Sequence, residues 1–296
     1  MTRVAVVQLA PVVGQYAANV AAASTAIAES ISAGADIVVL PELSTSGYQF
    51  ESVDEARSLA IRADDQVFAG WAALVAQRPD SVLVVGFAEL GANDCIYNSA
   101  AVVTASGVQN VYRKVHLWNT EKRFFTAGES GPLTVDTAHG RLGVLICYDL
   151  EFPEWTRLAA LAGVDLLAVP TNWPDIHRPA GERMPEVLIG MAAARVNKMA
   201  IAIADRSGVE RGLVWGEGST IIGADGWLVS QVGPGTGMAW ADLDLTHSRE
   251  KQLTEYSHVF GDRFPQLYAE LSTATPLSAT PPLSNTAPLS TTPPTI

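Results

Sequence analysis

The sequence predicts an α/β protein built in layers. Short runs rich in β-branched residues alternate along the chain with alanine-rich stretches of helical character, and hairpin patterns interrupt this alternation. In the run DIVVL at residues 36–40, every residue after Asp36 is apolar, which is typical of a strand buried on both faces. Apolar residues make up 48% of the 296 residues, enough for a large core. We therefore expect extensive burial between sheets or between sheet and helices.

The expected elements follow in order from the N-terminus. Strands are predicted at residues 4–9, 36–40, 82–89, 142–147, 166–169 and 199–204, with a hairpin at 97–104 and 108–113 and further strand pairs over 213–223 and 227–232. Helices are predicted at 17–32, within 54–78 as one or two helices, at 154–162 and over 182–198. The first of these ends at Gly34 and the helix at 154–162 ends at Gly163, because glycine readily adopts the conformation that stops a helix.

Residues 272–296 differ in composition from the rest of the chain. They are rich in Pro, Ser and Thr, they carry no charge, and Pro-Leu-Ser recurs at 276, 282 and 288. So much proline with so little bulky apolar surface cannot build a core. We therefore expect one folded domain at 1–271 and a disordered or polyproline-like tail at 272–296.

The chain is acidic, because 19 Lys and Arg stand against 31 Asp and Glu and give a net charge of −12. This balance argues against nucleic-acid binding, which depends on clustered cations that neutralise phosphate, and against a basic helix on a membrane surface. Charged residues are only 17% of the chain, so we expect a comparatively apolar surface and association of subunits.

Cysteine and histidine usage narrows the class of protein further. Cys95 and Cys147 cannot form a disulfide framework for a chain of this length, which indicates a reduced, cytoplasmic protein. No apolar run approaches the ~18 residues of a membrane span, and the N-terminal run is interrupted by Gln8 and Pro11, so we interpret it as a first strand and not a signal peptide. The five histidines lack metal-binding spacing, and we expect no metal or other cofactor.

Three reactive side chains lie at or just beyond the ends of predicted strands: Glu42, Lys114 and Cys147. Each alone is ordinary, because a cysteine after apolar residues is commonly an inert core thiol and the other two are commonly surface charges. Together, the three side chains supply complementary groups for one reaction. A thiol needs a base to become a nucleophile, a buried carboxylate can be that base, and an ammonium can neutralise the oxyanion that follows attack on a carbonyl or nitrile carbon.

The segments around these residues resemble the three motifs of the nitrilase superfamily of carbon–nitrogen hydrolases. They read VVLPELSTSGY at 38–48 (with Tyr48 at its end), YRKVHLWNTEKRFFTAG at 112–128 and GVLICYDLEFPE at 143–154, and later segments PTNW, ADRSGVERG and GEGSTIIGADG agree. The resemblance covers residues 1–265. It implies a four-layer α-β-β-α sandwich, two sheets face to face with helices outside, and a homodimer or higher homo-oligomer.

The resemblance also assigns roles. Cys147 matches the nucleophile, Glu42 the general base and Lys114 the lysine beside the oxyanion. The N–H of Tyr148 matches the backbone oxyanion donor, and Glu121 matches a second glutamate that orients substrate and holds the lysine. The positions that line the pocket in family members, or alternatively serve packing alone, correspond to Tyr48, Trp118, Asn172 and Trp173. The chain departs from many members at 193–197, where Val196 replaces an expected glutamate.

The string CYDLEFPE is more similar to amidase-type members than to nitrilases, which usually carry Trp-Glu after the cysteine. The resemblance thus implies hydrolysis of a small primary amide through a thioester. An N-carbamoyl amide or a nitrile as substrate on the same scaffold remains open. A non-catalytic interaction module is a distant alternative, because such a module has no reason to keep Glu42, Lys114, Glu121 and Cys147 together.

Overall fold

Strands with two buried faces form the centre of the computed structural model, which describes residues 1–272. In β1 (Thr2–Gln8), Val4 and Val6 point into one core and Ala5 and Val7 into another, because successive side chains of a strand point to opposite faces. The apolar run at 36–40 forms β2 (Ile37–Val39), and all of its residues are buried, as predicted.

These strands belong to two six-stranded sheets. The first sheet also contains β3 (Val82–Leu90), β4 (Ile96–Thr104), β5 (Gly107–Arg113) and β14 (Gly237–Leu243). The second contains β6 (Leu133–Thr137), β7 (Gly140–Val144), β8 (Leu166–Pro170), β9 (Ala200–Ala204), β12 (Thr220–Ile222) and β13 (Leu228–Gln231). Two short pairs lie outside the sheets: β10 (Val209–Glu210) with β11 (Leu213–Val214), and β15 (Gln252–Thr254) with β16 (Ser257–His258).

The two sheets have the same plan. Their strand orders are β14-β1-β2-β3-β4-β5 and β13-β12-β9-β8-β7-β6. In each, three neighbouring strands run parallel, β1–β2–β3 in the first and β7–β8–β9 in the second, and the remaining pairs are antiparallel. Glu42 and Cys147 lie just beyond the ends of β2 and β7, two of these parallel strands, and Lys114 follows the antiparallel edge strand β5.

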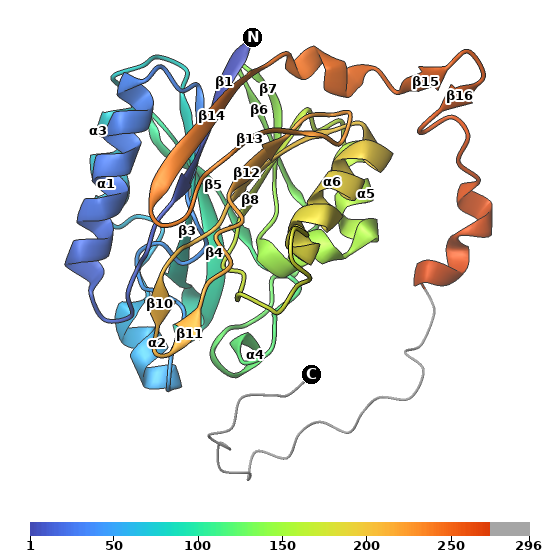
Figure 1. The fold of residues 1–296 in the computed structure, drawn as a ribbon. Coiled ribbons are helices and arrows are strands. Elements are labelled where there is room, and N and C mark those ends of the chain that lie inside the picture. The colour runs from blue at the N-terminus through green and yellow to red at the C-terminus, as the bar shows by residue number, and fades with distance from the viewer. Residues whose placement is uncertain (273–296) are drawn as a thin grey trace. The chain divides into compact units, whose positions relative to one another are not determined.

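Helices cover the outer face of each sheet (Figure 1). Helices α1 (Tyr16–Ser32) and α3 (Gln66–Val75) cover the first sheet, and α5 (Pro153–Leu161) and α6 (Pro185–Asn197) cover the second. Ala23, Ile27 and Ile31 recur every four residues along α1 and so share the face that packs on the sheet. Two short helices, α2 (Val53–Leu59) and α4 (Glu121–Phe124), lie near the strand ends. The predicted four-layer α-β-β-α sandwich is confirmed.

The core between the sheets joins residues of both. Val39 and Val84 from the first sheet and Val144 and Leu166 from the second belong to one buried cluster. Burial of each such side chain contributes roughly 1.5–3 kcal/mol, so this layer is a main source of stability. It also fixes the distance between the strand ends of the two sheets.

Some expected elements differ from the structure. The strand predicted at 142–147 begins earlier and ends at Val144, so that Cys147 lies beyond it in a 3₁₀ turn. The stretch 213–223 contains two short strands in different sheets. Strands β6 and β14 were not predicted, since glycine and polar residues hide their apolar pattern.

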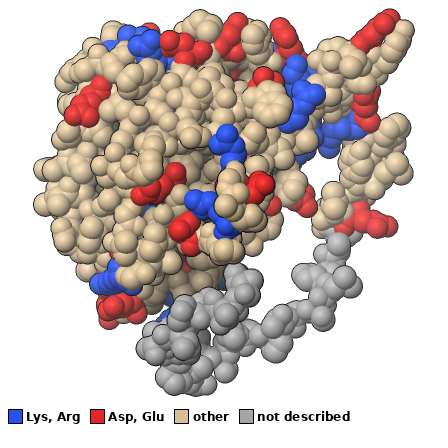
Figure 2. Space-filling view, viewed as in Figure 1, with Lys and Arg blue, Asp and Glu red and all other residues tan. Residues whose placement is uncertain are grey.

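The surface shown in Figure 2 carries acidic and basic side chains in small mixed groups, separated by wide uncharged areas. No helix within residues 1–272 is long and apolar enough to cross a membrane.

Residues Met1–Phe260 form one compact unit, and Gly261–Ser272 contain short 3₁₀ turns. The predicted tail lies outside the described residues, apart from Ser272. The boundary at 271, the oligomer and the cytoplasmic location stay predictions.

Candidate active site

Cys147 lies where the chain turns sharply out of the second sheet. It follows β7 and begins the 3₁₀ turn η2 (Cys147–Glu151), with a φ of 50° in the left-handed region that side chains rarely adopt. The residue is only 5% exposed, and its thiol donates a weak hydrogen bond to the carbonyl oxygen of Asn172 at 4.0 Å. The strained turn therefore holds the sulfur at the end of the sheet, inside the protein.

Asp149 holds this turn in place. Its buried carboxylate accepts hydrogen bonds from the backbone N–H of Ile146 at 3.2 Å, from the backbone N–H of His116 at 2.9 Å and from the hydroxyl of Tyr112 at 2.8 Å, while the His116 Nδ1 lies 2.7 Å away. The turn is thereby tied to the segment that follows β5. We did not predict this role from the sequence, although a carboxylate inside the apolar run around Cys147 was a usable signal.

Glu42 follows β2 and is completely buried. Its Oε1 accepts from the Nδ2 of Asn98 at 2.6 Å and from the Nζ of Lys114 at 2.7 Å. Its Oε2 has no hydrogen-bond partner within the part of the chain that the structure describes. Burial raises the pKa of Glu42 to about 7, although the charge of Lys114 opposes the rise. One oxygen is thus anchored and the other is available for a proton.

Lys114 connects two carboxylates. Its Nζ donates to Glu42 and, also at 2.7 Å, to the Oε1 of Glu121, the first residue of α4. Burial alone would lower the pKa of Lys114, but the charges of Glu121 and Glu42 outweigh burial and raise its pKa well above the ordinary value. The ammonium is therefore permanently charged, and it is held from two sides.

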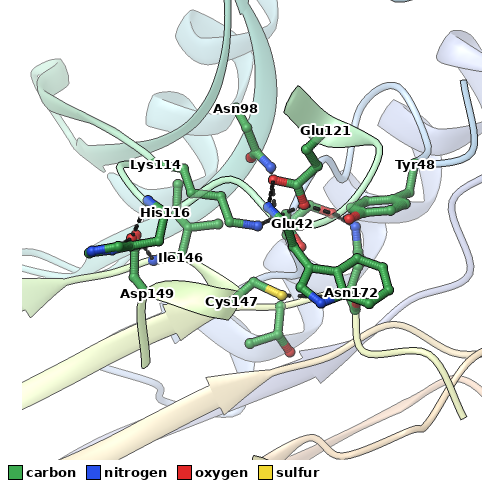
Figure 3. Close-up of polar contacts among 12 residues, drawn as sticks. Glu42, Tyr48, Asn98, Lys114, His116, Glu121, Ile146, Cys147, Asp149 and Asn172 are labelled. Atoms are coloured by element: carbon green, nitrogen blue, oxygen red, sulfur yellow. Dashed lines mark hydrogen bonds and ion pairs between the residues drawn. The ribbon is translucent and has the colours of Figure 1, made fainter. Parts of the chain in front are cut away.

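Glu121 accepts hydrogen bonds from two donors besides Lys114. The Tyr48 hydroxyl donates to its Oε1 at 2.5 Å, and the backbone N–H of Trp118 donates to its Oε2 at 3.2 Å. Figure 3 shows Tyr48, Glu121, Lys114, Glu42 and Cys147 converging on one place. The structure thus brings together all four residues that we predicted to be catalytic.

The predicted pocket residues lie around this group. The Asn172 Nδ2 donates to the backbone oxygen of Glu42 at 2.9 Å, which links the two sheets. Trp173 is 2% exposed, and its backbone N–H donates to Asp205 at 2.9 Å. Tyr148 is half-buried, with its ring edge-on to Phe152. Asn98, which anchors Glu42, was not predicted, and its only signal was an amide within the predicted strand at 97–104.

The electrostatics favour coupled proton transfer. Burial and the charge of Glu42 raise the pKa of the Cys147 thiol well above its ordinary value, although Lys114 opposes them. The resting thiol is therefore protonated at neutral pH, beside a carboxyl group that titrates near neutrality. Such a pair can pass the thiol proton to the carboxylate while the sulfur attacks.

A sandwich of two sheets with an enclosed thiol, carboxylate and ammonium defines a class of hydrolase that uses a cysteine nucleophile. The family model described as carbon-nitrogen hydrolase matches residues 3–252, and the chain belongs to this family.

Relatives and solved structures agree with this assignment. The chain is 34% identical over 269 residues to a nitrilase of Pyrococcus abyssi, covering 90% of this chain and 99% of that protein. It is 30% identical over 244 residues to a 2-oxoglutaramate amidase of Bacillus subtilis, covering 81% and 89%. It also matches a variant of the amidase from Nesterenkonia sp. AN1, solved with acrylamide added at the active-site cysteine, with a TM-score of 0.76 at 25% identity, covering 92% of this chain and 100% of that one. The enzyme is therefore a carbon–nitrogen hydrolase.

Proposed function

We propose that the protein hydrolyses a small primary amide to a carboxylic acid and ammonia, with a thioester on Cys147 as the intermediate. The observation that carries this proposal is the enclosed group in which Lys114 bonds both Glu42 and Glu121 beside the Cys147 thiol. A general base near neutrality, a fixed cation and a nucleophile are the groups that acyl transfer from nitrogen requires.

In the first half of the reaction, Glu42 accepts the thiol proton as the sulfur of Cys147 attacks the amide carbon. The carbonyl oxygen becomes an oxyanion, which the Lys114 ammonium and the N–H of Tyr148 stabilise. Glu42 then gives the proton to the amide nitrogen, the carbon–nitrogen bond breaks, and ammonia leaves. The acyl group remains on Cys147 as a thioester.

In the second half, a water molecule attacks the thioester carbon and Glu42 accepts its proton. The same two donors stabilise the second oxyanion. The carbon–sulfur bond then breaks, the proton returns to the sulfur, and the acid is released. The sum is one amide and one water converted to one acid and one ammonia, with the enzyme regenerated.

The burial of the site favours a small acyl group. Cys147, Tyr48 and Trp173 are 5%, 5% and 2% exposed, so the substrate is enclosed by aromatic side chains. The amidase relatives support an amide. A nitrile is the second candidate, because the relative from Pyrococcus abyssi is named a nitrilase. An N-carbamoyl amide is a third candidate on the same scaffold.

The test is ammonia release from a panel of small neutral amides, one N-carbamoyl amino acid and one nitrile. Cys147→Ala should abolish turnover of the amides, while Cys95→Ser, which removes the other free thiol, should leave it unchanged. Turnover of only the carbamoyl compound or the nitrile would overturn the substrate class. Turnover that survives Cys147→Ala would overturn the thioester mechanism.

A further inference from the structure

A buried ion pair lies in the ADRSGVERG segment, whose residues have no part in the reaction described above. The Arg206 Nη1 donates to the Oε2 of Glu210 at 2.8 Å, and both side chains are 1% exposed. Glu210 is the second residue of β10, in the short β10–β11 pair outside the two main sheets. A buried pair of this kind is weak evidence for stability, because the cost of removing two charges from water offsets their attraction. The backbone groups that bond to Glu210 indicate another role for this ion pair.

Glu210 accepts hydrogen bonds from the backbone of two other segments. Its Oε1 accepts from the N–H of Val13 at 2.8 Å, and its Oε2 accepts from the N–H of Tyr48 at 3.0 Å and of Gln49 at 2.9 Å. Gly47 has a φ of 77°, and a Cβ there would lie 2.5 Å from the Oε1 of Glu210. The carboxylate is thus packed directly against the loop that carries Tyr48.

The ring of Tyr48 is also connected to this ion pair, through Trp215. The Arg206 guanidinium lies over the Trp215 ring, 4.4 Å from its centroid, and the Trp215 ring meets the Tyr48 ring edge-on at 5.2 Å. The Tyr48 hydroxyl then donates to Glu121 at 2.5 Å, and Glu121 accepts from Lys114 at 2.7 Å. A continuous series of contacts therefore runs from Glu210 through Tyr48 to the catalytic lysine.

We propose that Glu210, paired with Arg206, is a positioning residue that sets the place of the Tyr48 hydroxyl and, through it, the orientation of Glu121 on Lys114. This inference rests on the proposed function of the site. Hydrogen bonds from N–H groups to a carboxylate are about twice as strong as those to a neutral acceptor, so the charge on Glu210 fixes the loop tightly. Displacement of reacting groups by about 1 Å can cost about 100-fold in rate.

The test is a double-mutant cycle on kcat for an amide that the wild type hydrolyses, with all variants made in a Cys95→Ser background so that iodoacetamide titration of Cys147 counts the active sites. Glu210→Gln places an amide NH₂ against backbone N–H donors, and we expect kcat to fall at least 10-fold. In a Tyr48→Phe background, where the hydroxyl is already absent, the same change should cost less than 2-fold. The matched control is Glu55→Gln, which breaks an ion pair of 2.6 Å to Arg211 beside β10 and should leave kcat unchanged.

Equal losses of kcat in both backgrounds, or an unchanged kcat with only a lower Tm, would overturn the proposal and leave Glu210 a structural role. If Glu210→Gln does not fold, Glu210→Asp keeps the charge but shortens the side chain, and the same cycle applies to it. If the wild type hydrolyses only a carbamoyl compound or a nitrile, the proposed substrate fails, and the cycle is measured on that compound. If it hydrolyses none of them, the rate constant for alkylation of Cys147 by iodoacetamide replaces kcat as the measured quantity. We expect Glu210→Gln to change this rate constant at least 3-fold and Glu55→Gln to leave it unchanged.

Discussion

The pH dependence of kcat/KM tests the central electrostatic feature of the site, the pKa of Glu42. Burial raises this pKa from the ordinary 4.5 to about 7. Because Glu42, as the proposed base, must be ionised to accept the thiol proton, activity should be lost as pH falls through this pKa. With a pKa of about 7, about half of Glu42 is ionised at pH 7 and about 1% at pH 5, so kcat/KM should fall about 50-fold. A carboxylate with its ordinary pKa would lose only about a quarter of the activity.

The assay is ammonia release at low concentrations of a neutral amide, between pH 5 and 8, with recovery of activity on return to pH 7 as the control for unfolding. Asn98→Leu supplies the second measurement. Asn98 donates to Glu42 at 2.6 Å and lowers its pKa, so its removal should move the midpoint to higher pH. A loss of less than about 3-fold at pH 5 would refute the raised pKa. A midpoint that Asn98→Leu does not move would assign the titration to another group, such as Asp205, whose pKa burial raises to about 6.

Two further predictions concern the lysine and the backbone beside the base. Lys114→Ala should lower kcat at least ~100-fold, because loss of one oxyanion donor costs about 2.7–4 kcal/mol, and a folded variant with near-normal kcat would contradict the role. Gly86→Ala should lower both kcat and the free energy of unfolding, the latter by about 1–3 kcal/mol, because its Cβ would lie 2.5 Å from the Cα of Glu42. Its control, Gly70→Ala on the exposed face of α3, meets no atom within 4 Å and should stabilise the protein by ~0.5–1 kcal/mol in urea unfolding.

The elements with strong periodicity could be predicted from the sequence. Helix α1 and the hairpin of β4 and β5 are present close to the predicted limits, because apolar spacing and turn glycines are local signals. Strand β14 could not be predicted in this way. It pairs with β1, more than two hundred residues earlier in the chain, and that partner is what completes its pattern of burial.

The site shows the same division between local and long-range information. Glu42, Lys114, Glu121 and Cys147 lie in motifs that a reader of the sequence can find, and the structure brings them together. Two of the residues that hold them were missed. Asp149 and Asn98 bond to groups 33 and 56 residues away, so their importance depends on which strand ends meet in the fold. The spacing of residues along the chain does not indicate such partners.

The two sheets divide the proposed reacting groups between them, and this has a consequence for folding. Glu42 and Lys114 follow strands of the first sheet, whereas Cys147 and Asn172 follow strands of the second, and the hydrogen bond from Asn172 to the Glu42 backbone joins the two sets. Neither half-sandwich contains a complete set. A complete site therefore exists only when the two sheets are docked, so the return of turnover during refolding reports the assembled sandwich and not the formation of either sheet alone.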